Sequence, residues 1–282
     1  MPEGAAAWTS VRVAPSDDTE RTRRACLAAL FGIGAQGVHE DRGSLVTHFP
    51  PGSDLLAMHA ALTEADENVV LETSMVPDID WSEAWKARLV AHELGALAIV
   101  PPWLAAGREA RRTVVIDPGM AFGTGDHATT RGVVRLLPAV LRPGDVVADL
   151  GAGSAVLSIA AAKLGAARVY AIELDHDAIA DAEENVGAND VADRVHIFEA
   201  DAAVLLPLVS PVRVVLANII SSVLLELLPA IESSLTPDGT AIISGILQEE
   251  RSAMLEALSL RGWRVLAEDA EDIWWSASIE RA

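Results

Sequence analysis

Short runs of alternating apolar and polar residues at the front of the chain predict a small α/β domain. Strands are expected at residues 10–13, 44–49 and 69–73, and helices at residues 19–30 and 54–65. An apolar residue at every second position favours a half-buried strand, whereas a spacing of three or four favours a helix. The order of these elements predicts a ferredoxin-like domain over residues 1–75.

From residue 113 onward, apolar runs alternate with helical patterns in the manner of a parallel, doubly wound sheet. Strands are expected at residues 146–150, 168–173, 195–199, 212–217 and 240–244, and helices at 155–164, 177–185 and 222–232. The strands at 263–268 and 273–279 are too close in sequence for a crossover helix, so they should pair antiparallel. The predicted fold class is α/β, with a Rossmann-like, seven-stranded sheet over residues 113–282.

A connector at residues 76–112 separates these two patterns and is punctuated by prolines and charges. Its middle, residues 82–91, has a helical pattern. Trp81 and Trp85 are four residues apart and would share one face of that helix. They are expected to pack against a neighbouring domain, with a role in gripping substrate as the alternative.

The composition indicates a globular, cytoplasmic protein. Hydrophobic residues make up 51% of the 282 positions, yet charges interrupt every run before it reaches the ~18 to 20 residues that span a bilayer. The first ten residues contain no basic cluster before an apolar stretch, unlike a secretory signal. Cys26 is the single cysteine, so neither an intramolecular disulfide nor a cysteine-based zinc cluster can form, and no metal site is predicted.

An excess of acidic residues limits the partners that the chain should attract. Asp and Glu number 41 and Lys and Arg number 21, which gives a formal net charge of −20. Such a charge repels nucleic acids and anionic membranes at long range, so we expect no direct binding to either. A basic protein partner fits the charge, although acidic residues also serve solubility or a high-salt habitat.

The first motif that carries chemistry is an apolar strand that runs into a glycine-rich turn, Asp149-Leu150-Gly151-Ala152-Gly153-Ser154-Ala155. Such a turn lets a ligand approach the backbone at the carboxyl ends of the strands. The third glycine of the dinucleotide fingerprint is replaced by Val156. Asp149 would repel a pyrophosphate but suits a ligand with an ammonium group and a cationic sulfur, which favours S-adenosylmethionine over NAD.

Two further acidic residues follow the next strands and support the same site. Glu173 lies 22 residues after Gly151 in the sequence and could accept hydrogen bonds from both ribose hydroxyls. Asp201 follows the third strand and could orient the adenine amino group. An exposed strand-end glutamate and an ordinary loop aspartate are the structural alternatives for these two residues.

The most specific motif is the loop at residues 117–130, Asp-Pro-Gly-Met-Ala-Phe-Gly-Thr-Gly-Asp-His-Ala-Thr-Thr. It lacks the lysine of a phosphate-binding P-loop. Its glycines suggest a backbone folded tightly over a ligand, and Thr130 offers a hydroxyl at the start of the next helix. Phe122 and Gly123 are therefore included among the predicted cofactor contacts.

Asn218 and His127 are the candidate catalytic residues. Asn218 ends an apolar strand, where its side-chain oxygen could accept a hydrogen bond from an incoming amine; a strand-capping role is the alternative. A lysine of pKa ~10.4 needs roughly 4.6 kcal/mol to lose its proton at pH 7, and an α-amine needs less. Desolvation beside a cationic sulfonium can supply much of this energy, so no dedicated base is required and His127 has the alternative role of shaping the loop.

The loop, the glycine turn and Asn218-Ile219-Ile220 resemble the ribosomal protein L11 methyltransferase family. That family shows an Asp-Pro-Gly-Leu-Ala-Phe-Gly-Thr-Gly-Thr-His-Pro-Thr-Thr loop, a Gly-Cys-Gly-Ser-Gly turn and an Asn-Ile-Leu segment. The resemblance covers residues 80–245. The chain departs from the family's Thr, Pro, Cys and Gly at Asp126, Ala128, Ala152 and Ala155.

The resemblance implies a class I methyltransferase domain behind an amino-terminal domain that recruits a basic ribosomal protein, L11. It implies contacts of S-adenosylmethionine with Thr130, Gly151, Glu173 and Asn218. The residue patterns described above add three further predicted contacts, Asp149, Gly153 and Asp201. The expected reaction is methyl transfer to lysine ε-amines, with an α-amine as a further target. Two alternatives stay open: a methyltransferase of another protein or small amine, and a non-catalytic S-adenosylmethionine-binding protein.

Overall fold

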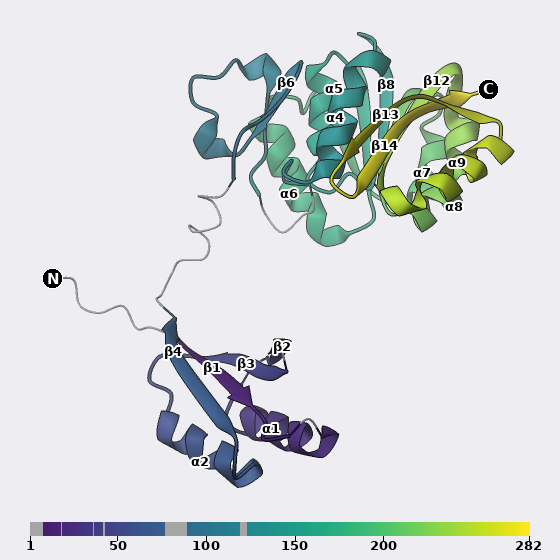
Figure 1. Cartoon of the computed structure of the whole chain (residues 1–282). Helices are drawn as coiled ribbons and strands as arrows, with labels where there is room; N and C mark the ends of the chain where they lie inside the picture. Colours follow the sequence, from purple (N-terminus) through teal and green to yellow (C-terminus); the bar gives the residue numbers. More distant parts are fainter. Residues whose placement is uncertain (1–7, 18, 36, 42, 77–88, 119–122) are drawn as a thin grey trace. The chain divides into compact units, whose positions relative to one another are not determined.

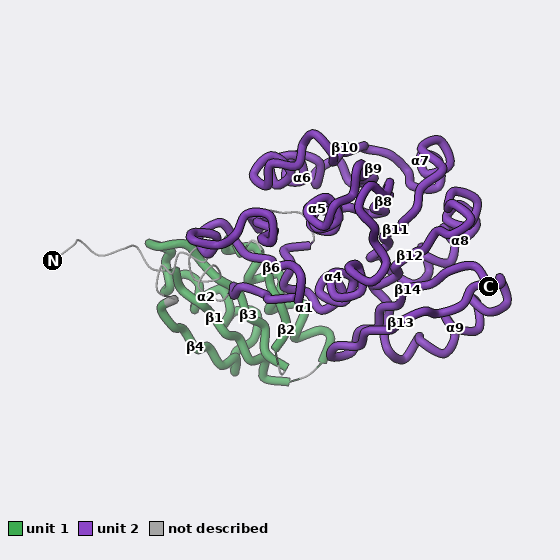
Figure 2. The backbone as a smooth tube through the Cα atoms, turned by 90° about the horizontal axis from the view of Figure 1, so that it is seen from above, with its two compact units in different colours: residues 1–88 green, residues 89–282 purple. Residues whose placement is uncertain are grey.

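The computed structural model describes residues 8–17, 19–35, 37–41, 43–76, 89–118 and 123–282. The chain divides into two compact units, Met1–Arg88 and Leu89–Ala282, which are described separately (Figure 2). Trp81, Trp85 and residues 82–88 of the expected helix lie outside the described residues. Residues 89–91 are described and form no helix.

The described part of the first unit is an antiparallel sheet with two helices. Its elements are β1 (Trp8–Ala14), α1 (Glu20–Gly32), β2 (His39–Asp41), β3 (Ser44–Phe49), α2 (Leu55–Ala65) and β4 (Val70–Val76). The strand order is β2-β3-β1-β4, and every pair is antiparallel. Thr19 and Asp54 cap α1 and α2 by accepting hydrogen bonds from backbone N–H groups of the first turn. The predicted ferredoxin-like order is confirmed, and β2 was missed because it has only three residues.

A seven-stranded sheet forms the centre of the second unit. Its strands are β8 (Val146–Leu150), β9 (Arg168–Glu173), β10 (Val195–Glu199), β11 (Val212–Asn218), β12 (Leu235–Leu247), β13 (Trp263–Glu271) and β14 (Trp274–Arg281). They lie in the order β10-β9-β8-β11-β12-β14-β13. The first five strands are parallel, whereas β14 runs antiparallel to both β12 and β13. The antiparallel pairing of β13 with β14 was predicted.

Helices cover both faces of this sheet (Figure 1). One face carries α4 (Ala128–Val140), α5 (Val156–Lys163) and α6 (His176–Ala188), and the other carries α7 (Ala202–Leu208), α8 (Ser221–Ser234) and α9 (Arg251–Leu260). Each layer of helices packs its buried apolar residues on one side of the strands. The predicted α/β fold class is confirmed, and the carboxyl ends of the parallel strands meet at one edge of the sheet.

A small sheet lies before this core in the sequence and was not predicted. It contains β5 (His92–Leu94), β6 (Leu97–Val100) and β7 (Thr113–Val115), in the order β5-β6-β7. The described residues of this unit also form the 3₁₀ helices η1 (Pro102–Leu104), η2 (Ala110–Arg112) and η3 (Gln248–Glu250). Among the helices that the structure describes, none combines the length and apolar character needed to cross a membrane.

Candidate functional site

The glycine turn leaves β8 in a conformation that only small residues tolerate. Gly151 and Gly153 have φ angles of 69° and 51°, in the left-handed region that favours glycine. A Cβ atom added to Gly151 would lie 2.8 Å from the Cγ2 atom of Ile219. The turn therefore exposes backbone where a side chain would fill the space, which is the cradle that the sequence predicts at the end of the first strand.

Glu173 is fastened to this turn by backbone hydrogen bonds. One carboxylate oxygen accepts a hydrogen bond of 2.8 Å from the N–H of Gly153, and the other accepts bonds from the N–H groups of Leu174 and Asp175. Three neutral donors hold the carboxylate at the carboxyl end of β9. These hydrogen bonds thus join the glycine turn and the acidic residue of the next strand into one unit.

A cavity of about 390 Å³ opens beside this unit. It brings together Gly151, Glu173 and Asp201, three of the predicted cofactor contacts, at the ends of β8, β9 and β10. Asp201 also caps α7 by accepting a hydrogen bond from the N–H of Ala203 at 2.8 Å. The remaining lining is mostly apolar and comes from the ends of β9, β10 and β11 and from α7 and α8, namely Ile172, Leu174, Ala200, Ala202, Ala203, Ile219, Val223, Glu226 and Leu227.

Asp149 lies behind the turn and does not line that cavity. Its side chain is fully buried, and one carboxylate oxygen accepts a hydrogen bond of 2.7 Å from the Ser158 hydroxyl on α5. The other oxygen has no hydrogen-bond partner among the described residues. Burial, with a smaller contribution from the charge of Glu173, raises the pKa of Asp149 to about 7.

Asn218 and Thr130 meet at a second point of the ligand edge. The side-chain nitrogen of Asn218, at the end of β11, donates to the Thr130 hydroxyl at 3.4 Å. Thr130 is fully buried in the first turn of α4. The side-chain oxygen of Asn218 is also buried and has no partner among the described residues. A group that carries an N–H would satisfy this acceptor.

His127 caps the amino terminus of α4. Its Nδ1 atom accepts from the N–H of Thr129 at 3.4 Å and lies 2.7 Å from the hydroxyl oxygen of the same residue. The ring also packs edge-on against Trp274, with 5.0 Å between the centroids. Burial and the charge of Arg131 lower the pKa of His127, which favours the neutral ring that can accept these bonds. These contacts give His127 a structural role, and its catalytic role stays a prediction.

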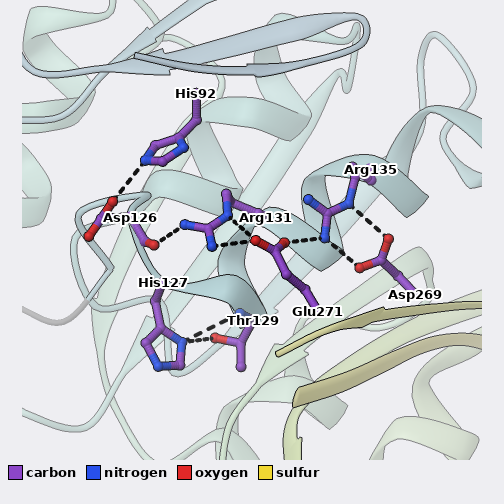
Figure 3. Close-up of polar contacts among 8 residues, drawn as sticks. All are labelled: His92, Asp126, His127, Thr129, Arg131, Arg135, Asp269 and Glu271. Atoms are coloured by element: carbon purple, nitrogen blue, oxygen red, sulfur yellow. Dashed lines mark hydrogen bonds and ion pairs between the residues drawn. The ribbon is translucent and has the colours of Figure 1, made fainter. Parts of the chain in front are cut away.

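Ion pairs tie the start of α4 to the β13–β14 hairpin (Figure 3). Glu271 accepts hydrogen bonds from Arg131 and Arg135, and Arg135 also pairs with Asp269. Asp126 also contacts His92, whose Nε2 atom lies 2.9 Å from a carboxylate oxygen of Asp126. The network therefore stabilises the segment from which His127 and Thr130 project. In the described part of the chain, His, Cys, Asp and Glu side chains form no group that could hold a metal ion.

The structure thus brings most of the predicted site residues to one edge of the sheet. Gly151, Glu173 and Asp201 share the cavity, and Asn218 contacts Thr130. Gly123 leads from the loop toward α4, and its carbonyl accepts a hydrogen bond from Ser154, whereas Phe122 lies outside the described residues.

Several residues of the site were not predicted from the sequence. Ile219 and Val223 line the cavity, and Ser158 contacts Asp149. An apolar residue that follows a strand, or a serine inside a helix, has no local signal that separates this role from ordinary packing.

Comparisons with known proteins point in one direction. The family described as "Ribosomal protein L11 methyltransferase (PrmA)" matches residues 18–282. A ribosomal protein L11 methyltransferase of Thermus thermophilus is 37% identical over 88% of this chain and 91% of its own length. The corresponding protein of Enterococcus faecalis is 39% identical over 74% of this chain and 66% of its own length, just under two thirds.

A solved structure agrees with these sequence relatives. The crystal structure of a ribosomal protein L11 methylase from Lactobacillus delbrueckii subsp. bulgaricus matches 68% of this chain and 98% of its own, with a TM-score of 0.60 and 32% identity. The matches confirm the predicted fold class and the methyltransferase class of enzyme. Because the family match spans nearly the whole sequence, the chain belongs to the ribosomal protein L11 methyltransferase family.

Proposed function

We propose that this chain transfers methyl groups from S-adenosylmethionine, the cofactor implied by its family, to amine nitrogens of ribosomal protein L11 in the cytoplasm. The observation that carries the proposal is the side-chain oxygen of Asn218, a buried acceptor without a partner among the described residues. It lies at the ligand edge of the sheet, where a substrate N–H group would satisfy it. An unsatisfied buried acceptor costs about 1–3 kcal/mol, so a partner in the working complex explains its presence.

The residues at this edge fit the proposed cofactor. The cavity lined by Gly151, Glu173 and Asp201 combines mostly apolar walls with carboxylates, which suits a nucleoside with ribose hydroxyls and an amino group. The unpartnered oxygen of Asp149 and the charge of Glu173 favour a cationic ligand nearby. When bound, the cofactor supplies a methyl group on a cationic sulfur.

Asn218 would orient the accepting amine. The Thr130 hydroxyl engages the side-chain nitrogen of Asn218, which leaves the oxygen to receive an N–H group of the substrate. An amine that donates to this oxygen has its lone pair directed away from Asn218. Positioning of this kind lowers the barrier because the two reacting groups meet in one geometry. This arrangement needs no dedicated base at Asn218 or Thr130.

Methyl transfer to the proposed substrate is directly testable. Purified chain would be incubated with methyl-labelled S-adenosylmethionine and purified ribosomal protein L11, and incorporation would be located by mass spectrometry of the peptides. We expect label on lysine ε-amines or on the α-amine. A folded chain that binds the cofactor but leaves L11 unlabelled would reject this substrate, and labelling of other components of a cell extract would then assign another one.

An acidic pocket near the same edge supports a basic substrate. A cavity of about 340 Å³ is lined by Glu249, Asp272, Leu247, Gln248 and Ile273. The side chains of Glu249 and Asp272 form no hydrogen bond or ion pair with the described residues, so both carboxylates can meet an incoming cation. The neighbouring residue Trp274 pairs with Leu247 across β14 and β12 and packs against His127.

Charge-neutralising variants would test this pocket. We expect the double variant E249Q/D272N to raise the KM for L11 several-fold and to leave the KM for S-adenosylmethionine unchanged. The matched control E183Q/E184Q removes the same charge from the exposed face of α6 and should leave both constants near those of the wild type. Equal effects of the two double variants would show that net charge alone attracts the substrate.

A further inference from the structure

Asn185 joins the glycine turn to the beginning of the loop that precedes α4. It lies in α6 with 2% of its surface exposed. Its side-chain oxygen accepts a hydrogen bond of 2.9 Å from the N–H of Asp117, and its nitrogen donates to the carbonyl of Ser154 at 3.2 Å. Both partners are backbone groups with a fixed hydrogen-bonding role, so the orientation of the amide is determined.

Ser154 fastens the other end of the same loop. Its hydroxyl donates a hydrogen bond of 2.7 Å to the carbonyl of Gly123, and only 2% of its surface is exposed. A Cβ atom added to Gly123 would lie 2.9 Å from this hydroxyl oxygen, so the backbone approaches as closely as a glycine allows. Ser154 is therefore bonded directly to Gly123 and, through Asn185, to Asp117.

The position of these two bonds matters because the same turn forms the cavity. Gly151 lines the cavity, and the N–H of Gly153 holds the carboxylate of Glu173. Ser154 follows immediately in sequence, yet neither it nor Asn185 lines the cavity. The two side chains thus connect the walls of the site without contacting the ligand space.

Asn189, the residue that follows the last residue of α6, shows what a purely structural asparagine does. One turn after Asn185, its side chain accepts a hydrogen bond from the N–H of Val115 at 2.9 Å and donates to the carbonyl of Val115 at 2.6 Å. Asn189 is also buried, with 5% of its surface exposed. It therefore fixes β7 to α6, whereas Asn185 fixes the loop that follows β7 to the glycine turn.

We propose that Asn185 and Ser154 are positioning residues for the methyl donor. They set the spacing between the glycine turn and the two ends of the loop, and so determine how tightly the donor is held. This inference rests on the proposed function, since it assumes that the donor binds against the turn. A binding site keeps its geometry when the side chains behind it are themselves locked by packing and hydrogen bonds, which is the arrangement of Asn185 and Ser154.

The test compares three alanine variants, N185A, S154A and N189A. Affinity for S-adenosylmethionine is measured by calorimetry, steady-state constants are measured with L11, and unfolding temperature is measured without ligand. We expect N185A and S154A to raise both the Kd and the KM for S-adenosylmethionine about tenfold, with kcat within about twofold of the wild type. N189A should lower the unfolding temperature comparably to N185A but leave the Kd within about twofold.

Three outcomes would overturn the inference. The first is a Kd of the wild-type value in both N185A and S154A, and the second is a loss of affinity in N189A equal to theirs. S154A removes a single oxygen atom, so it keeps the test valid if N185A fails to fold. The calorimetric result requires no protein substrate, so it stands if L11 proves to be the wrong acceptor. A wild type that does not bind the donor is the third outcome, and it rejects the proposed function as well.

Discussion

The hydroxyl of Ser158 donates a hydrogen bond of 2.7 Å to the fully buried carboxylate of Asp149, nine residues earlier in the chain. Hydrogen bonding from Ser158 does not compensate for removing the charge from water, and burial raises the pKa of Asp149 to about 7. The folded chain therefore binds a proton at Asp149 over a pH range in which the unfolded chain has released it. The stabilisation that this proton provides is fully present below pH 3.8 and is lost as the pH rises through about 7.

The variant D149N should remove this pH dependence. We expect the ligand-free wild type to lose more stability than D149N between pH 5 and pH 8, by about 5 °C of unfolding temperature. The sign follows because an asparagine cannot acquire a charge in the buried site. Unfolding temperatures of both proteins, measured across that range without ligand, would check it, and parallel curves would contradict a titrating Asp149.

Removal of the Asn218 side chain should affect the reaction more than the binding of the donor. The variant N218A loses the buried oxygen that we assign to the substrate amine, so we expect kcat to fall roughly 10- to 100-fold because the acceptor is no longer held in line. The Kd for S-adenosylmethionine should change much less. As a control, T130V keeps the shape of Thr130 but leaves the Asn218 amide unanchored, and we expect a smaller loss of kcat. An unchanged kcat in N218A would assign Asn218 to the strand-capping role.

Glu173 should contribute mainly to donor affinity. Its carboxylate holds three backbone N–H groups and lines the cavity at the end of β9. Hydrogen bonds to a charged group contribute about 1.5–3 kcal/mol, so E173Q should weaken S-adenosylmethionine binding about 10- to 100-fold. Glu199 is its register partner on β10 and pairs with exposed His176 instead. Calorimetry should show weaker binding of S-adenosylmethionine to E173Q than to the wild type, and unchanged binding to E199Q. Equal affinities of the two variants would show that Glu173 does not bind the donor.

The ion pairs between α4 and β13 predict sensitivity to acid. Hydrogen bonds from Arg131 and Arg135 lower the pKa of Glu271 to about 2. A carboxyl group with a depressed folded-state pKa stabilises the protein above its unfolded value of 4.5, and this contribution is lost as the pH falls toward about 2. The variant E271Q should therefore unfold about 3–6 °C below the wild type at pH 7, and the difference should close between pH 5 and pH 2.

A matched change on the same strand provides the control for Glu271. Arg264 pairs with Glu280 but has a side chain that is 64% exposed, so R264Q should shift the unfolding temperature by no more than about 2 °C. If R264Q and E271Q had equal effects at pH 7, the partly buried network would contribute no more than an ordinary surface pair.

The sequence predicted the sheet and its ligand edge well because long apolar runs dominate the pattern there. The strand at residues 44–49 and the parallel strands β8, β9 and β10 have the predicted bounds. The three-residue strands β2, β5 and β7 are too short to show a period of two, and they were missed. The β13–β14 hairpin was recognised because the separating segment is too short for a helix.

The sequence predicted the contacts of individual side chains less well than the order of the helices and strands. Asp149 was expected at the strand end as a carboxylate that faces a cationic ligand, yet its side chain is buried against α5. The strand pattern cannot show this, because residue 158 is linked to residue 149 only once α5 packs on the sheet. Asn185 contacts Asp117, 68 positions earlier, and contacts of that span leave no local signal.

Ala155 occupies a backbone position at which the resemblance expects glycine. Its φ angle is 62°, in the left-handed region that side chains rarely adopt, and the residue caps α5 while fully buried. An L-residue in this region costs about 1–2 kcal/mol relative to glycine. Replacing Ala155 with glycine would remove this cost. Part of the gain in stability is offset because glycine also gives the unfolded chain more conformational freedom. We therefore expect A155G to stabilise the protein by about 0.5–1 kcal/mol, which corresponds to roughly 1–4 °C of unfolding temperature.

The neighbouring alanine of the same turn separates backbone strain from a general effect of glycine. Ala152 has no left-handed backbone, since its φ angle is not positive. It is also packed in the core with 6% of its surface exposed. The variant A152G gives up side-chain packing and adds freedom to the unfolded chain, so it should lower the unfolding temperature while A155G raises it. Thermal unfolding of the two variants and the wild type in one buffer would decide the matter, because a loss of stability in both would mean that Ala155 carries no strain.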